Sequence, residues 1–254
     1  MYDFYLGGKD NFQVDRDTGR RMIRLAPEVL DVARTNRAFL QRAVRYLVRD
    51  AGIRQIIDIG TGLPTAGNVT ETARDLCRET RIICVDNDPI VYIQARALLS
   101  GGEGNVVPIQ ADARDPHAIL AHPEVRALID FTQPVAVLFI AILNFIADNE
   151  DPYGIVSAFR DTVAPGSYLA VSHGTSDLHP ASTVKRAEEL YDVATAPIVL
   201  RTHDQIARFF QGWDLIPPGL VQVPLWRPEG PPPPPEVLTK IGIYGGVARR
   251  SVQS

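Results

Sequence analysis

The sequence predicts an α/β fold in which helices cover both faces of an open, mostly parallel sheet. Short apolar runs recur after residue 54, and helical stretches separate each run from the next. Because these runs lack polar alternation, they are typical of parallel strands that are buried on both faces. With 254 residues, 45% of them hydrophobic and 22% charged, the chain is long enough to bury one large core.

The first 52 residues are expected to form a helical extension that precedes the sheet. Between Pro27 and Gly52 apolar residues recur at helical spacing, and Asn36 with Arg37 occupies one turn of that apolar stripe. The earlier segment 5–12 is polar and rich in glycine, which predicts a loop.

Five strands and four helices are expected to alternate between residues 54 and 172. We place the strands at 55–59, 81–85, 105–109, 135–140 and 167–172, and the helices at 66–78, 89–100, 116–128 and 152–163. Three of these helices begin with Asp followed by Pro. The Asp side chain accepts hydrogen bonds from the free N–H groups of the first turn. Pro has no N–H group, which is harmless there because the first-turn N–H groups have no partner within the helix.

The last third of the chain predicts one more helix and two more strands. A capping box at 202–205 opens the helix, which ends at Gly212, and the strands are placed at 213–216 and 240–247. The proline-rich stretch 228–235 is expected to be an extended surface connection. The prediction is therefore a seven-stranded sheet whose last strand is antiparallel.

Composition argues against several classes of function. There are 26 basic and 30 acidic residues and the pI is near 5.7, which argues against nucleic acid or an anionic membrane as the main partner. The longest apolar run, at 135–143, has nine residues, about half of the roughly 20 that a spanning helix needs. Cys77 and Cys84 are too few for a disulfide framework and fit no zinc spacing, and no signal peptide is apparent. We therefore expect a reduced, cytoplasmic protein without a metal site.

An acidic residue lies at or just beyond the end of each of the first three predicted strands. Asp58, Asp86 and Asp112 are separated by 28 and 26 residues, about one strand–helix–strand step each. Open parallel sheets bind ligands at the carboxyl ends of their strands. These three acids are therefore expected along one ligand-binding edge of the sheet.

The residues around these acids favour a nucleoside ligand without a phosphate. A carboxylate at Asp86 is able to accept both hydroxyls of a ribose. A pyrophosphate requires a glycine-lined helix N-terminus, but the turn 60–65 has Pro64 and Thr65 where a third glycine belongs, with Asp58 close by. An adenosine with a positive or zwitterionic tail, such as S-adenosylmethionine, fits this turn better. An NAD(P)-dependent oxidoreductase is the rival interpretation.

Short segments distributed over the whole chain are similar to one bacterial family. They lie at 5–12, 26–28, 36–40, 58–65, 164–169, 218–221, 224–228 and 244–247. The chain resembles the S-adenosyl methyltransferases, formerly a domain of unknown function, within the class I S-adenosylmethionine-dependent methyltransferases. The resemblance implies a Rossmann-like fold and direct methyl displacement to a small-molecule acceptor. A non-catalytic protein that binds S-adenosylmethionine or its demethylated product is the alternative.

The resemblance also implies a domain plan. The chain would be a single methyltransferase domain over 1–254, with a helical cap at 1–52, a cofactor-binding core at 53–175 and a C-terminal substrate region with the last strands at 176–254. The cap and the segment 172–200 are expected to close over the strand ends. No oligomeric state is implied.

Site residues follow from the same resemblance. Backbone at Gly60 and Gly62 would approach the methionine portion, Asp58 its ammonium, Asp86 the ribose hydroxyls, and Asp112 the adenine amino group. The full candidate set for the cofactor is Asn36, Arg37, Asp58, Gly60, Thr61, Gly62, Asp86, Asn87, Asp112 and Ala113. The chain departs from the superfamily pattern at Pro64, where glycine is usual, and at Asn87, where an apolar residue often packs on adenine.

Several polar residues keep two interpretations open. Asn36 and Arg37 either turn to solvent or border the cofactor pocket, with Arg37 on the methionine carboxylate. Asn144 follows the fourth strand and either contacts a substrate or caps the strand. His173 is a candidate general base, since a neutral imidazole titrates near neutral pH. A metal site of His173 with Asp177 and His179 matches no standard spacing.

Overall fold

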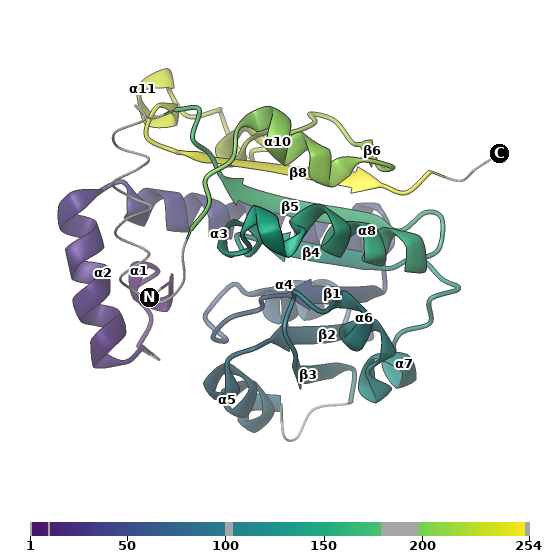
Figure 1. Ribbon diagram of the computed structural model, residues 1–254. Helices are drawn as coiled ribbons and strands as arrows, with labels where there is room; N and C mark the ends of the chain where they lie inside the picture. The colour runs from purple at the N-terminus through teal and green to yellow at the C-terminus, as the bar shows by residue number, and fades with distance from the viewer. Residues whose placement is uncertain (1, 10, 100–103, 179–197, 252–254) are drawn as a thin grey trace.

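The centre of the computed structural model is one sheet, and the model describes residues 2–9, 11–99, 104–178 and 198–251 (Figure 1). Its strands are β1 (Gln55–Ile59), β2 (Arg81–Asp86), β3 (Val106–Gln110), β4 (Ala136–Ile140), β5 (Tyr168–Gly174), β6 (Asp214–Leu215), β7 (Val221–Gln222) and β8 (Ile243–Arg249). Their order is β3-β2-β1-β4-β5-β8-β6, with β7 also paired to β8. Strands β1 to β5 are parallel, whereas β8 is antiparallel to each strand that it pairs with.

The predicted α/β fold is confirmed. The first five strands lie within two residues of their expected bounds. The described part of the chain has eight strands, one more than predicted, because the two-residue strand β7 also pairs with β8. Such a short pairing leaves no pattern in the sequence.

Helices cover both faces of the sheet. One face carries α3 (Val29–Arg45), the π-helical turn η1 (Tyr46–Asp50) and α4 (Val69–Leu76). The opposite face carries α6 (Pro116–Ala121), α7 (Pro123–Leu128), α8 (Pro152–Thr162), α10 (His203–Ala207) and η4 (Arg208–Phe210). Helix α5 (Pro89–Leu99) packs along β2 and β3. Each face has its own apolar cluster, in which Phe139 packs edge-on to Phe159 on one side and Phe39 packs edge-on to Trp226 on the other.

The remaining elements are short or peripheral. Helices α1 (Tyr2–Tyr5) and α2 (Gln13–Leu25) pack on α3 through a small separate cluster. Two 3-10 turns, η2 (Leu143–Phe145) and η3 (Asp148–Glu150), follow β4, and η5 (Val223–Leu225) and α11 (Pro235–Leu238) flank the exposed proline-rich stretch. None of the described helices combines the length and the apolar character that crossing a bilayer requires.

Some predicted helix bounds were wrong for local reasons. The helix expected at 116–128 is divided into α6 and α7, because Pro123 opens a second helix whose first N–H group bonds the His122 side chain. The helix expected at 66–78 begins only at Val69, where Asn68 is its N-cap. The segment 5–12, expected as a loop, is preceded by α1 and begins within it. Of the segment expected to close over the strand ends, residues 179–197 lie outside the described residues.

The Asp-Pro helix starts behave as predicted. The carboxylates of Asp88, Asp115 and Asp151 accept hydrogen bonds from backbone N–H groups of the first turns of α5, α6 and α8, at 2.8–2.9 Å. These caps fix where each helix begins at the carboxyl edge of the sheet.

Candidate functional site

Two adjoining cavities lie over the carboxyl ends of β1, β2 and β3. The smaller, about 270 Å³, extends toward Asp112 and Ala113, and the larger, about 430 Å³, extends toward α1 and α3. Five residues line both cavities: Gly60, Asp86, Asn87, Ile142 and Phe145. The parallel sheet therefore places one continuous site where its fold class predicts a ligand.

The turn after β1 is shaped by glycine. Gly60 has a φ of 73°, and a Cβ there would lie 2.6 Å from a side-chain carbon of Ile142. The N–H groups of Gly60 and Thr61 donate to the Val85 carbonyl at 2.8 and 3.0 Å, which ties the turn to β2. Only glycine satisfies both the left-handed backbone and the contact with Ile142.

Asp86 lies between the two cavities and accepts backbone hydrogen bonds. Its carboxylate receives the Gly62 N–H at 2.8 Å and the Asp88 N–H at 3.0 Å. Partial burial nevertheless raises the pKa of Asp86, and the nearby Asp88 charge adds to that rise. Asp86 therefore links the glycine turn to the tip of β2 and still borders open space on both sides.

The carboxyl group of Asp58 is almost fully buried. Its side chain is 4% exposed, and Thr61 Oγ1 donates to its carboxylate at 2.7 Å. Burial raises the pKa of Asp58 to about 6, although the Thr61 hydrogen bond and the Arg37 charge act in the opposite direction. A cationic ligand group in the larger cavity would lower that pKa again.

Asp112 lies at the far end of the smaller cavity. Its carboxylate accepts the Arg114 N–H at 2.9 Å and pairs with the Arg114 guanidinium at 3.1 Å. The same guanidinium contacts Glu150 at 2.8 Å. Ala113 and Ile146 line this cavity together with Arg114, so the end of the cavity combines apolar side chains with the paired charges of Asp112 and Arg114.

Asn36 and Arg37 face the larger cavity and do not turn to solvent. Tyr2 OH donates to the Ala33 carbonyl at 3.0 Å, so it accepts from Asn36 Nδ2, also at 3.0 Å. That bond leaves Asn36 Oδ1 as an acceptor. Arg37 donates to Thr65 Oγ1 at 2.9 Å. Within the described residues, Asn36 Oδ1 and Arg37 Nε are buried and have no hydrogen-bond partner.

The predicted cofactor residues all surround this site. Asn36, Arg37, Asp58, Thr61 and Gly62 line the larger cavity, Asp112 and Ala113 line the smaller, and Gly60, Asp86 and Asn87 line both.

Residues that the sequence analysis did not name as site residues close this site from two other segments. These are Ile142, Phe145 and Ile146 after β4, and Tyr2, Asp3 and Tyr5 of α1. The position after the fourth strand, at the same edge of the sheet, was the available signal for the first group. The second group belongs to the helical cap that was expected to close over the strand ends, but which of its side chains reach the site depends on how α1 packs.

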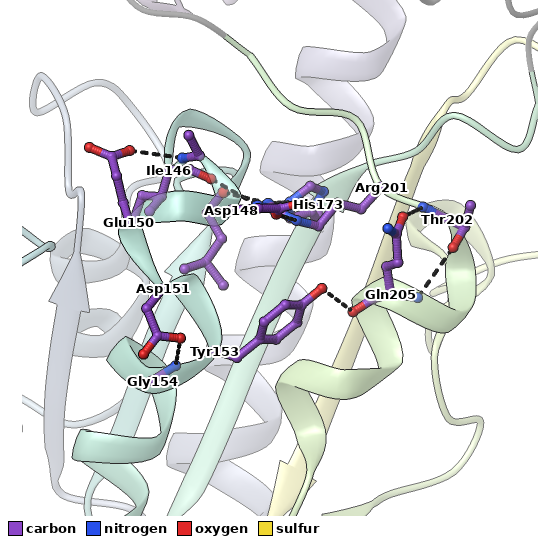
Figure 2. Close-up of polar contacts among 12 residues, drawn as sticks. Ile146, Asp148, Glu150, Asp151, Tyr153, Gly154, His173, Arg201, Thr202 and Gln205 are labelled. Atoms are coloured by element: carbon purple, nitrogen blue, oxygen red, sulfur yellow. Dashed lines mark hydrogen bonds and ion pairs between the residues drawn. The ribbon is translucent and has the colours of Figure 1, made fainter.

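His173 lies outside both cavities in the described structure. The imidazole is fully buried, its Nδ1 is 2.7 Å from the Gly174 carbonyl, and its Nε2 is 2.8 Å from Arg201 Nη1 (Figure 2). Because a guanidinium is always a donor, Nε2 accepts and Nδ1–H donates. Burial lowers the pKa of His173 to about 4. The structure thus places this imidazole against Gly174 and Arg201 and not in the lining of either cavity.

Asn144 is also buried, and its side chain is not part of either cavity wall, although its neighbour Phe145 is. Its carbonyl accepts from the Val199 N–H at 2.8 Å. The third proposed metal ligand, His179, lies outside the described residues, and no group of three or more potential ligands occurs among the residues that are described.

Comparisons with known proteins identify the family. The model of the S-adenosyl methyltransferase family matches residues 1–251. A DUF574 family protein from Streptomyces avermitilis MA-4680 is 41% identical, with a TM-score of 0.92 over 98% of this chain and 95% of that chain. A Thermobifida fusca YX protein that is provisionally named a methyltransferase is 35% identical, with a TM-score of 0.93 over 99% and 93%.

A more distant similarity shows the fold alone. The 1,6-didemethyltoxoflavin-N1-methyltransferase of Burkholderia thailandensis, solved with 1,6-didemethyltoxoflavin and S-adenosylhomocysteine, is 14% identical, with a TM-score of 0.55 over 94% of this chain and 88% of that one. A comparison with curated proteins finds no match. The chain belongs to the S-adenosyl methyltransferase family and is an S-adenosylmethionine-dependent methyltransferase of Rossmann-like fold.

Proposed function

We propose that the two adjoining cavities hold S-adenosylmethionine and that a small-molecule acceptor receives its methyl group in the larger one. The observation that carries this proposal is the pairing of an apolar end, bordered by Asp112, with a polar end at Asn36 and Arg37, and with Asp86 between them. That order of groups matches adenine, ribose and amino acid along the cofactor. We place the reaction in the cytoplasm, in keeping with the two free thiols.

The polar end fits an amino-acid group. Asn36 Oδ1 is a buried acceptor and Arg37 Nε a buried donor, and both lack a partner among the described residues. Buried polar groups in native proteins are almost always paired, so a ligand that supplies both partners is expected. An ammonium would satisfy Asn36 and a carboxylate would satisfy Arg37. Asp58 would add a negative charge near the ammonium.

The other end fits a nucleoside. Asp86 retains acceptor capacity beyond its two backbone hydrogen bonds, which suits the ribose hydroxyls. Asp112 would accept from the adenine amino group, and Ala113 would donate its N–H to a ring nitrogen. Phe145 and Ile146 supply apolar surface for the ring between these polar contacts.

When bound, S-adenosylmethionine supplies a methyl group on a sulfonium, which is already a good leaving group. The residues of this chain therefore orient the two reactants and exclude water. Together these two effects supply most of the rate enhancement in a reaction of this kind. The helices α1 and α3 cover the larger cavity and would keep solvent from the acceptor. No covalent nucleophile is required, and the acceptor is expected to carry its own oxygen, nitrogen or carbon nucleophile.

Calorimetric titration tests the cofactor site. Wild-type protein is expected to bind S-adenosylmethionine and S-adenosylhomocysteine but not NADH. Asp86→Ala should weaken both affinities by at least about tenfold, since it removes hydrogen bonds to a charged acceptor. Asp161→Ala, which removes an exposed carboxylate on α8, is the matched control and should bind like the wild type. Binding of NADH alone, or an unchanged Asp86→Ala, would refute the assignment.

Methyl transfer needs its own test. Protein incubated with methyl-labelled S-adenosylmethionine and fractionated small-molecule extracts should move the label into a low-molecular-weight product. A protein that binds the cofactor tightly yet transfers no label to any fraction would instead be a cofactor-binding protein without catalysis.

A further inference from the structure

Arg201 is an almost fully buried cation. Its side chain is 1% exposed, although a buried guanidinium is strongly unfavourable unless every donor is paired. The five N–H groups of Arg201 make five hydrogen bonds to four acceptor atoms. Nε and Nη2 donate to Asp148 Oδ1 at 3.2 and 2.6 Å, and Nη2 also donates to the Ile146 carbonyl at 2.9 Å. Nη1 donates to the Leu143 carbonyl at 2.9 Å and to His173 Nε2 at 2.8 Å. Figure 2 shows this group of contacts.

Two of these four acceptors lie on one segment of the cavity wall. We define the wall segment as residues 142–146, which contribute Ile142, Phe145 and Ile146 to the cavities. The carbonyls of Leu143 and Ile146 lie on either side of Phe145 in the chain, and both accept from Arg201. The guanidinium thus binds the backbone of the segment whose apolar side chains line the cavities.

The guanidinium is itself held from two further directions. His173 at the end of β5 accepts from Nη1, and Phe209 stacks on this imidazole and lies 5.6 Å from the guanidinium carbon. The Arg201 N–H donates to the Gly174 carbonyl at 3.3 Å. Because β5 is a central strand of the sheet, Arg201 connects the wall segment to the rigid part of the fold.

A second arginine contacts the turn that follows the wall segment. Arg114 contacts Glu150 at 2.8 Å, and Glu150 accepts from the Ala147 N–H at 2.8 Å. This contact lies beyond the wall segment, at η3. Arg201 is therefore the cation that acts directly on the backbone around Phe145.

We propose that Arg201 is a positioning residue for cofactor binding, because it fixes the wall segment against the adenine and methionine ends of the site. This inference rests on the proposed function of the two cavities. Arg201 does not touch the cavities, so its effect acts through Ile142, Phe145 and Ile146. A displaced Ile142 would also release its close contact with Gly60, on the other side of the site.

Binding measurements on three variants test this role. Arg201→Lys keeps the positive charge but has fewer donors in a different geometry, and should raise the Kd for S-adenosylmethionine and S-adenosylhomocysteine about tenfold. Asp148→Ala removes the partner of Nε and of one Nη2 donor from a mostly exposed position, and should raise both Kd values about threefold in a folded protein. Hydrogen exchange of the 142–146 amides should be faster in both variants.

Arg42→Lys is the matched control. Arg42 also donates to two backbone carbonyls, those of Trp226 at 2.8 Å and Val223 at 2.6 Å, but on the opposite side of the sheet from the wall segment. Its loss should lower the melting temperature and leave both Kd values unchanged. A purely structural role of Arg201 would produce this same pattern, so a lower melting temperature with wild-type Kd values in Arg201→Lys overturns the inference.

The remaining outcomes are also decisive. If Arg201→Lys does not fold, wild-type affinity in Asp148→Ala overturns the inference and a raised Kd supports it. Equal Kd increases in Arg42→Lys and Arg201→Lys would indicate general loosening and overturn it too. A wild-type protein that binds neither compound contradicts the proposed function itself, whereas a binding wild type with unaffected variants contradicts only the role of Arg201.

Discussion

The buried carboxyl group of Asp58 destabilises the folded chain when it is charged. A carboxylic acid whose pKa is raised by burial binds its proton more tightly in the folded chain than in the unfolded chain. Folding stability therefore falls as the pH rises from the unfolded pKa, near 4, through the folded pKa, about 6, and the full cost is present above that value. The positive charge of a bound cofactor would offset part of this destabilisation.

Asp58→Asn is predicted to stabilise the protein without ligand. The neutral amide keeps an acceptor for Thr61 and removes the buried charge, so the gain in unfolding free energy should approach about 3 kcal/mol at pH 8 and about half of that at pH 5. Denaturant unfolding at the two pH values measures it. Asp50→Asn is the control with the opposite sign, because the Arg49 guanidinium lowers the pKa of that carboxyl. A less stable Asp58→Asn at pH 8 would contradict the prediction.

Gly60 combines a backbone and a packing requirement. Gly60→Ala should cost about 1–2 kcal/mol for its left-handed backbone and a further 1–3 kcal/mol, roughly, for the overlap with Ile142. It should also weaken S-adenosylmethionine binding, since Gly60 lines both cavities. Gly52→Ala separates the two costs, because Gly52 has a φ of 69° but open space around it. Equal unfolding free energies for the two variants would show that Ile142 moves aside freely.

At the scale of elements, helix caps at the carboxyl edge of the sheet set where the loops around the site begin. Asp151 follows η3 directly and caps α8 from a left-handed backbone conformation, with a φ of 52°. Its side chain accepts from Gly154 N–H at 2.9 Å (Figure 2). The start of α8 thereby fixes the end of the loop that contains the wall segment.

Asp151→Ala is predicted to lower the unfolding free energy by about 1–2 kcal/mol, because it removes the cap and keeps the unfavourable φ. Asp151→Asn should retain most of the stability, since asparagine caps well and tolerates this backbone conformation. Chemical denaturation of both variants measures the difference. The prediction fails if the two variants lose equal stability.

At the scale of the whole molecule, the site joins parts that differ in the size of their apolar clusters. The sheet has a large cluster on each face, whereas the cluster of α1 and α2 has, among the described residues, three buried members, Tyr5, Met22 and Ala33, with partly buried side chains around them. The larger cavity is lined both by α1 and by the strand tips. A ligand in that cavity would therefore connect α1, where apolar packing is sparse, to the strand tips of the well-packed sheet.

S-adenosylmethionine is predicted to slow hydrogen exchange of residues 2–25, by up to about a hundredfold when the ligand is present at 100 times its Kd. The reason is that local opening of α1 and α2 would have to release the ligand first. Exchange measured by mass spectrometry checks this, with α11, remote from both cavities, as the internal control. Equal protection of α11 would indicate a global effect instead.

The sequence by itself determined the alternation of strands and helices, the Asp-Pro caps and the acids at or just beyond the ends of β1, β2 and β3. These features are local, because burial on both faces removes polar alternation and a cap acts within one turn. The resemblance in the motifs added the family and the proposed role of Asp112.

Only the tertiary structure decided which other residues meet at the site. Phe145 and Tyr2 are more than 140 positions apart in the chain, yet both line the larger cavity. The same holds for His173, which follows a predicted strand and, in the folded chain, accepts a hydrogen bond from Arg201, 28 residues later. A side chain's partner depends on which loops pack together, and that is a property of the folded molecule which residue spacing along the chain does not record.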